Sequence, residues 1–147
     1  MYKHILIPTD GSSLARAAAI AGVRLARALG AKVTGFHASR AAVPLEYKGL
    51  FSVDYSKPAV RSNAIKKMAA KHLDVIERAA KAAGVRCEVE HVTDDYAAEA
   101  IVKAAKRKGC DLIFMPTHGR RGFKDSMLGS QTRRVLSMSK LPVLIHR

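Results

Sequence analysis

The sequence contains no tryptophan, and aromatic residues make up only 5% of its 147 residues. Surfaces that stack single-stranded nucleic acid interleave aromatic with basic side chains, so this composition does not favour one. No apolar run approaches the roughly 18 residues needed to cross a bilayer, and the first residues lack the pattern of a signal peptide. We therefore expect a cytoplasmic protein.

Cysteine is scarce as well, because Cys87 and Cys110 are the only two and they form no CxxC motif. Two distant cysteines in a cytoplasmic chain rarely form a structural disulfide. Both are predicted to be small residues in or near the core.

Acidic residues are few, with 12 Asp and Glu against 26 Lys and Arg and a net charge of +14. A positive field favours anionic ligands and non-specific contact with nucleic acid. A solvated basic surface explains the same composition, so the charge alone does not choose a function.

The length corresponds to about one domain, and we treat residues 1–147 as a single domain. Apolar runs alternate with amphipathic segments along the chain. Strands separated by helices predict right-handed crossovers and a parallel sheet with helices on both faces. We expect strands over residues 3–7, 31–36, 86–92, 111–115 and 141–146, and helices over residues 14–29, 58–83, 96–108 and 131–138.

Several finer features follow from the same pattern. The strand over 86–92 has one more polar face, which indicates a sheet edge. Residues 39–57 show no period and are predicted to be a loop that covers the site. The first helix is expected to bury Leu14, Ala18, Ala21, Leu25 and Ala28, and the second to bury Ile65, Met68, Ala69, His72, Leu73, Ile76 and Ala80.

Two polar or glycine-containing turns follow strand ends, at residues 8–11 and 117–119. Ligands of parallel sheets bind at the carboxyl ends of strands, so these turns form one site if their strands are neighbours. Gly119 is followed, after nine residues, by Gly129 and Ser130 at the start of a predicted helix. Glycine permits close approach of the backbone, and N–H groups at a helix start bind phosphate.

With these segments the chain resembles the universal stress protein family over its full length. The segments that carry the resemblance are residues 5–12, 35–37, 98–101, 111–122, 128–130 and 141–145. The resemblance implies an open five-stranded parallel α/β sheet with helices on both faces and strand order 3-2-1-4-5. This is the Rossmann-like architecture of the adenine-nucleotide alpha-hydrolase type.

The nucleotide-binding members of that family carry the motif G-x2-G-x9-G-[S/T]. Gly119, Gly129 and Ser130 match it, but Pro116 stands where the first glycine is expected. Proline has no N–H and a fixed φ, so any contact that needs either is lost.

The resemblance also implies roles for individual residues. Asp10 would contact the ribose or adenine side, with Pro8 and Thr9 in the wall. Ala38 would offer backbone groups to adenine, and Met115 would pack against the base. The phosphates would be surrounded by residues of the glycine loop and the following helix, with basic charge nearby: Thr117, His118, Gly119, Arg120, Arg121, Gly129, Ser130 and Gln131.

A carboxylate beside phosphates is unfavourable unless a cation intervenes. Asp10 is therefore expected at the sugar end of the site, or sharing Mg²⁺ with the phosphates. An alternative reading makes Asp10 the N-cap of the first helix.

Among the histidines, His118 is expected to be functional and His37 is a weaker candidate near the same face. The remaining four show no metal-ligand spacing, and we expect them to lie at the surface or to have hydrogen-bond partners within the fold: His4, His72, His91 and His146.

The function implied by the resemblance is regulatory binding of ATP, with AMP and cyclic AMP as alternatives and Mg²⁺ as a possible companion. A homodimer through strand 141–146 is implied too. The sequence has no GxSxG, Walker A, GxGxxG or HExxH motif, so at most a weak ATPase is expected. Two alternatives stay open: a nucleotide-free interaction module whose site is impaired by Pro116, and a nucleic-acid binder that uses the basic surface.

Overall fold

The computed structural model describes residues 1–42, 54–120 and 128–147. The predicted strands and helices are present in the predicted order, with small differences at their ends. Their bounds are β1 His4–Pro8, α1 Ser13–Leu29, β2 Lys32–Ser39, α2 Pro58–Ala83, β3 Cys87–Thr93, α3 Ala97–Arg107, β4 Leu112–Pro116, α4 Ser130–Met138 and β5 Val143–His146. The predicted loop over 39–57 starts too early, because Ser39 is the last residue of β2, and its residues 43–53 lie outside the described part.

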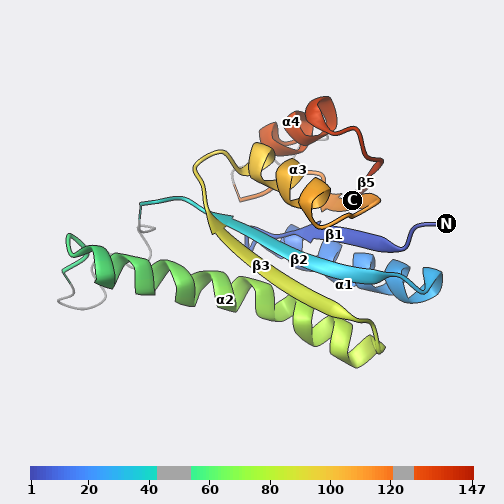
Figure 1. The fold of residues 1–147 in the computed structure, drawn as a ribbon, viewed down its shortest axis with the longest axis horizontal. Helices are drawn as coiled ribbons and strands as arrows, with labels where there is room; N and C mark the ends of the chain where they lie inside the picture. Colours follow the sequence, from blue (N-terminus) through green and yellow to red (C-terminus); the bar gives the residue numbers. More distant parts are fainter. Residues whose placement is uncertain (43–53, 121–127) are drawn as a thin grey trace.

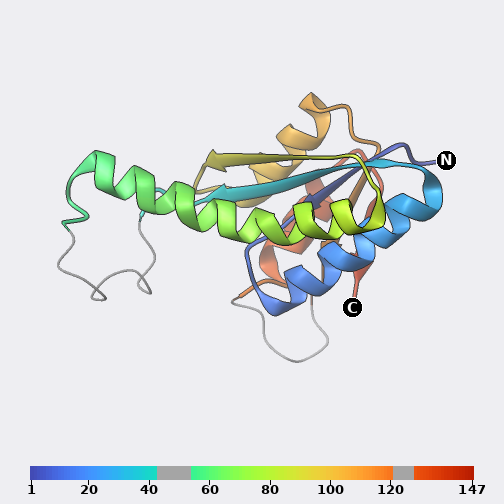
Figure 2. The same cartoon turned by 90° about the horizontal axis from the view of Figure 1, so that it is seen from below.

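The five strands form one parallel sheet in the order β3-β2-β1-β4-β5, which confirms the predicted architecture. β1 lies at the centre and is buried along its whole length, whereas β3 is an edge strand, as its polar face indicated. Helices α1 and α2 cover one face of the sheet, and α3 and α4 cover the other (Figure 1; Figure 2).

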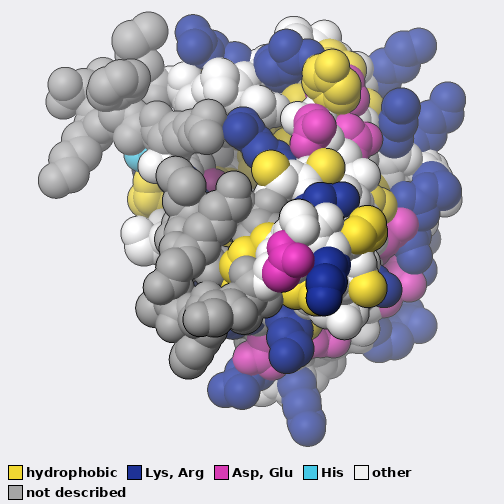
Figure 3. All heavy atoms as spheres, turned by 90° about the vertical axis from the view of Figure 1, so that its left-hand side faces the viewer, with side chains coloured by type: hydrophobic (Ala, Val, Ile, Leu, Met, Phe, Trp, Pro, Cys, Tyr) yellow, Lys and Arg dark blue, Asp and Glu magenta, His cyan; other side chains and the backbone are white. Residues whose placement is uncertain are grey.

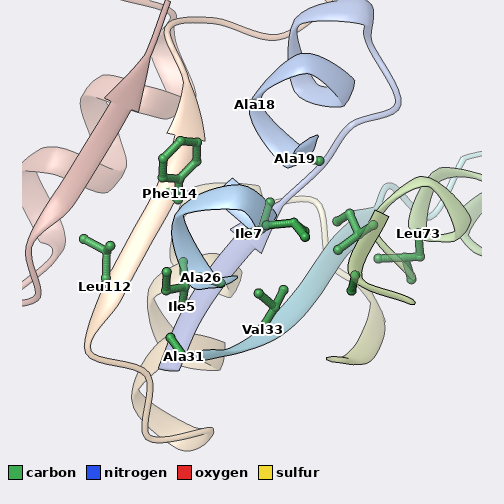
Figure 4. Packing of buried hydrophobic residues seen from close by; sticks show 13 residues of the cluster. Ile5, Ile7, Ala18, Ala19, Ala26, Ala31, Val33, Leu73, Leu112 and Phe114 are labelled. Carbon is green, nitrogen blue, oxygen red and sulfur yellow. The ribbon is translucent and has the colours of Figure 1, made fainter. Parts of the chain in front are cut away.

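Each face of the sheet has its own hydrophobic core, because successive side chains of a strand point to opposite faces. Ile5 and Ile7 of β1 pack with α1, α2 and Phe114 on one face (Figure 4). Leu6, between them, packs with α3 and Val135 of α4 on the other.

The buried face of helix α1 is rotated from the predicted one. Ala18 is buried as predicted, but Leu14, Ala21 and Leu25 are only partly buried and Ala28 is exposed. The other buried residues are Ala15, Ala19, Gly22, Val23 and Ala26.

Close approach of α1 to the sheet explains this difference. A Cβ atom on Gly22 would lie 2.8 Å from Cδ1 of Ile7 and 3.0 Å from Cδ1 of Phe114. The helix therefore turns its smallest residues inward and leaves the leucines at the margin. On α2 the predicted inward face is confirmed, with His72 at its partly exposed border.

The two cysteines lie where they were expected. Cys110 is 5% exposed and its burial raises the pKa of its thiol to about 11. Cys87 is partly buried, and burial raises its pKa as well. In the ranges that the structure describes, no helix has the length and apolar character required to cross a membrane.

Candidate functional site

The sheet opens between β1 and β4. These strands pair through Ile5 with Leu112 and Leu6 with Ile113, and this pairing stops short of the end of both strands. On the outer sides, pairing of β1 with β2 and of β4 with β5 continues to Pro8 and Pro116. The strand order reverses direction here, so this is the switch point at which parallel sheets bind ligands.

A cavity occupies this opening. Its volume is about 150 Å³. Its wall contains most of the residues singled out from the sequence: Pro8, Thr9, Asp10, Ala38, Met115, His118, Gly119, Gly129, Ser130 and Gln131. Thr117 and Arg120 do not line it, and Arg121 lies outside the described residues.

Part of the cavity wall is apolar. Sequence reasoning missed five lining residues, because they resemble ordinary core residues: Ala15, Phe36, Ala97, Ile101 and Thr132. Pro116, which the family motif had singled out, lines the cavity as well. Phe36 and Ala38 of β2 contribute to the same cavity as Met115 of β4 and Ile101 of α3. Such a wall suits a planar, largely apolar group.

The start of α4 also lines the cavity. Gly129 is the N-cap residue, and no side chain of the described residues caps this helix start. The N–H groups of the first helical turn have no intrahelical partners and carry partial positive charge. They are suited to bind an anion.

Gly129 is needed for close packing of two backbone segments. Its N–H donates to the carbonyl of Thr117 at 2.8 Å. A Cβ atom at Gly129 would lie 2.9 Å from Cα of His118 and 2.8 Å from its Cβ. Any side chain at this position would push the turn after β4 away from α4.

Two side chains hold α4 in place. The hydroxyl of Thr132 donates to the carbonyl of Pro116 at 3.1 Å. The side-chain oxygen of Gln131 accepts from the N–H of Ala98 at 3.1 Å, and so links α4 to the start of α3. The Gln131 amide group is thus engaged with α3, although the residue lines the cavity.

Pro116 is accommodated at the end of β4. The next residue, Thr117, donates its N–H to the carbonyl of His146 at 3.2 Å, so pairing with β5 continues past the proline. The carbonyl of Pro116 is bonded to Thr132. The substitution therefore leaves the local architecture intact.

Asp10 connects the two turns of the site. One carboxylate oxygen accepts from the N–H of Ser12 and the other from the N–H of Arg120, each at 2.9 Å. Burial acts to raise the pKa of Asp10, but the hydrogen bonds from Ser12 and Arg120 outweigh it and hold the pKa below its usual value. A Cβ atom on Gly119 would overlap this carboxylate.

The reading of Asp10 as the N-cap of α1 is wrong. The N-cap is Ser12, whose hydroxyl accepts from the N–H of Ala15 at 3.2 Å. Asp10 lies two residues earlier and is free to face the cavity.

The two candidate histidines differ in position. His118 lines the cavity, with its Nδ1 3.1 Å from the hydroxyl of Thr117. His37 was expected near the same face, but its ring lies on the opposite face of β2, because its neighbours Phe36 and Ala38 line the cavity. Its Nδ1 lies 2.7 Å from the carbonyl oxygen of Thr9.

The described residues contain no group of three His, Cys, Asp or Glu side chains that could hold a metal ion. Charges of both signs lie on the face seen in Figure 3. Figure 3 shows many Lys and Arg side chains with Asp and Glu side chains between them, and no continuous basic surface on this face.

A model of the universal stress protein family matches residues 1–147. The chain belongs to this family. It is 33% identical over 149 residues to the universal stress protein YxiE of Bacillus subtilis, and the match covers 100% of both chains.

Solved structures of the family have the same architecture. The chain is similar to the protein MJ0577 of Methanocaldococcus jannaschii, with a TM-score of 0.76 and 28% identity over 99% of this chain and 95% of that one. It is also similar to a universal stress protein solved in complex with cAMP, with a TM-score of 0.67 and 25% identity over 99% of this chain and 97% of the other.

Proposed function

We propose that this universal stress protein binds an adenine nucleotide, with ATP as the main candidate and AMP or cyclic AMP as alternatives, in the cavity between β1 and β4. The observation that carries the proposal is the mixed lining of the cavity. Apolar side chains, among them Met115 and Phe36, line it together with the start of α4, which no side chain in the described ranges caps. The related structure that contains cAMP supports the choice of an adenine ligand.

The base would pack between β2 and Met115, and the phosphates would accept hydrogen bonds from the N–H groups of Ser130 and Gln131. His118 would add a donor at the phosphate end. Asp10 would lie towards the sugar. Each oxygen of its carboxylate already accepts one N–H and retains a further lone pair, so it could also bind Mg²⁺ beside the phosphates.

The role proposed for the bound nucleotide is regulatory. The cavity wall in the described part of the chain holds one carboxylate, Asp10, and one imidazole, His118. These are bonded to backbone groups and to Thr117, respectively, which suits binding better than activation of a nucleophile. The compartment predicted from the sequence, the cytoplasm, stays a prediction.

Calorimetric titration of ATP, with and without Mg²⁺, tests the proposal. The wild-type protein is compared with Gly129→Asp, which adds a negative charge at the phosphate end and pushes against His118. Ser137→Asp is the matched control, because it adds the same charge on the exposed far part of α4. All three proteins are measured at two salt concentrations.

We expect wild type and Ser137→Asp to bind ATP and Gly129→Asp to lose at least tenfold in affinity, about 1.4 kcal/mol or more. Absence of binding in the wild-type protein would refute the proposal and favour the nucleotide-free interaction module. Binding that Gly129→Asp leaves intact, and that falls steeply with salt, would instead favour phosphate contacts on the basic surface.

We further propose that the protein forms a homodimer through the strand predicted at 141–146. β5 is the outer strand of its side of the sheet, and an edge strand presents unpaired backbone groups. Leu144 on this strand is 38% exposed, and Leu136 and Met138 of α4 are exposed too. Sedimentation equilibrium should give a dimer for wild type and a monomer for Leu144→Lys. A monomeric wild-type protein would refute this assembly.

A further inference from the structure

Three histidines that are distant in sequence come together beside the nucleotide cavity. The ring centroids of His37 on β2 and His72 on α2 are 5.1 Å apart, edge to face. Those of His37 and His91 on β3 are 5.9 Å apart, with the rings inclined by 20°. We call these residues the histidine cluster. It lies on the face of β2 opposite the cavity, because Phe36 and Ala38 point into the cavity.

The histidine cluster contacts the β1–α1 turn, residues 9–12. Nδ1 of His37 lies 2.7 Å from the carbonyl oxygen of Thr9. The ring of His72 lies directly against Gly11, where an added Cβ atom would overlap it. Asp10, between these two contact points, holds the turn after β4 through the N–H of Arg120. The cluster therefore supports the turn that forms one wall of the cavity.

His37 can accept a further proton only at a buried atom. A carbonyl oxygen is an acceptor, so Nδ1 of His37 carries the proton of the neutral ring and Nε2 is unprotonated. His37 is 5% exposed, and its Nε2 has no hydrogen-bond partner among the described residues. A proton at Nε2 would create a charge in a buried position without a partner.

The charges that act on the cluster are mostly positive. Arg120 faces it from the turn after β4, and Lys66 and Lys71 face it from α2. Arg61, also on α2, lines the same surface hollow as His91. Asp10, from the β1–α1 turn, is the negative group that acts on His37 and His72.

This environment favours neutral rings. Burial lowers the pKa of His37. Burial, followed by the charges of His37 and Arg120, lowers the pKa of His72 to about 4. Burial, followed by the charges of His37 and Lys66, lowers the pKa of His91, whose Nε2 is paired with the hydroxyl of Ser39 at 2.8 Å.

We propose that the histidine cluster makes nucleotide binding pH-sensitive: protonation in acid repels the rings from one another, loosens the β1–α1 turn and lowers the affinity of the cavity. The proposal rests on the proposed function, since it concerns regulation of the same cavity. His72, at the partly exposed border of α2, gains hydration by moving outward once charged. Gly11 then loses the ring that packs against it, and Asp10 is held less firmly opposite Arg120.

The test is calorimetric titration of ATP from about pH 7 to about pH 4, because burial lowers the pKa of His72 to about 4, below the usual range of histidine. The wild-type protein is compared with His72→Phe, which keeps a planar ring but cannot be protonated. His146→Asn, which removes a histidine outside the cluster and the cavity, is the control. His118 is present in all three proteins, so its contribution is common to them.

A proton whose pKa differs by one unit between the free and bound protein changes the affinity by up to about tenfold. At about pH 4 His72 is only partly protonated, so the effect of the cluster is about twofold there. Between neutral pH and about pH 4, we expect wild type and His146→Asn to lose about twofold more affinity than His72→Phe does.

Equal pH dependence in wild type and His72→Phe would overturn the pH proposal alone, whereas absence of ATP binding at neutral pH would overturn the proposed function as well. If His72→Phe does not fold, as judged by circular dichroism, His72→Gln takes its place. Titration of the wild-type histidine ring signals by NMR needs no variant. A pKa of His72 that saturating ATP leaves unchanged would also overturn the pH proposal.

Discussion

Gly11→Ala tests the contact between the β1–α1 turn and the histidine cluster. Gly11 has a φ of 79°, in the left-handed region, and its missing Cβ faces the ring of His72. The matched control is Gly84→Ala. Gly84, after α2, has a φ of 69°, but nothing lies within 4 Å of its missing Cβ. The two substitutions share the backbone strain and differ in the steric contact.

The expected magnitudes follow from these two terms. A left-handed alanine costs about 1–2 kcal/mol. Alanine also has less conformational freedom than glycine in the unfolded chain, and this stabilises the folded state by about 0.4–1 kcal/mol. Gly84→Ala should therefore reduce the free energy of unfolding by about 1 kcal/mol. Gly11→Ala should cost a further 1–3 kcal/mol or so, because the ring of His72 must be displaced.

Urea unfolding followed by circular dichroism measures both values, and equal slopes for the variants would show that the midpoints report stability. The double variant Gly11→Ala/His72→Ala should recover most of the extra cost, giving a coupling free energy of about 1–3 kcal/mol. Equal destabilisation by Gly11→Ala and Gly84→Ala, together with additivity in the double variant, would refute the packing of His72 against this turn.

Three further predictions concern the same region. Ser12→Ala should lower the free energy of unfolding by about 1 kcal/mol in urea, because α1 loses its N-cap hydrogen bond to Ala15. Asp10→Asn should weaken ATP binding in calorimetry, because an amide nitrogen facing the N–H of Arg120 cannot accept from it, and an unchanged affinity would contradict this role. The free energy of unfolding should decrease as the pH falls from 6.5 towards 4, because in this range the histidines are protonated in the unfolded chain but stay neutral in the folded cluster. Thermal unfolding at several pH values measures this decrease.

The architecture could be read from the sequence because its signals are local. Apolar runs such as residues 111–115 alternate with long amphipathic segments, and the order of such elements leaves few possible topologies. The buried face of helix α1 was harder to predict, because its many alanines make several of its faces apolar. The face that packs was selected by Gly22, which lets the helix approach Ile7 and Phe114, and that contact is tertiary.

The cavity was partly predictable for a similar reason. The glycines and polar residues of the two turns are recognisable, and most of them line the cavity. The apolar wall could not be recognised in the same way, because Phe36 and Ile101 have the pattern of ordinary core residues in the sequence. The histidine cluster was missed because its members come from β2, α2 and β3, and no sequence spacing relates them.

The buried thiol of Cys110 gives this protein an intrinsic reporter of local opening. A thiol reacts as its thiolate, so a buried group with a pKa of about 11 should be nearly inert to thiol-specific reagents while the region around β4 stays folded. Cys87, on the edge strand β3, should be modified first. The rate of the slower phase would then measure how often the sheet opens at the start of β4, at the end opposite the cavity, in the unaltered protein and without an introduced label.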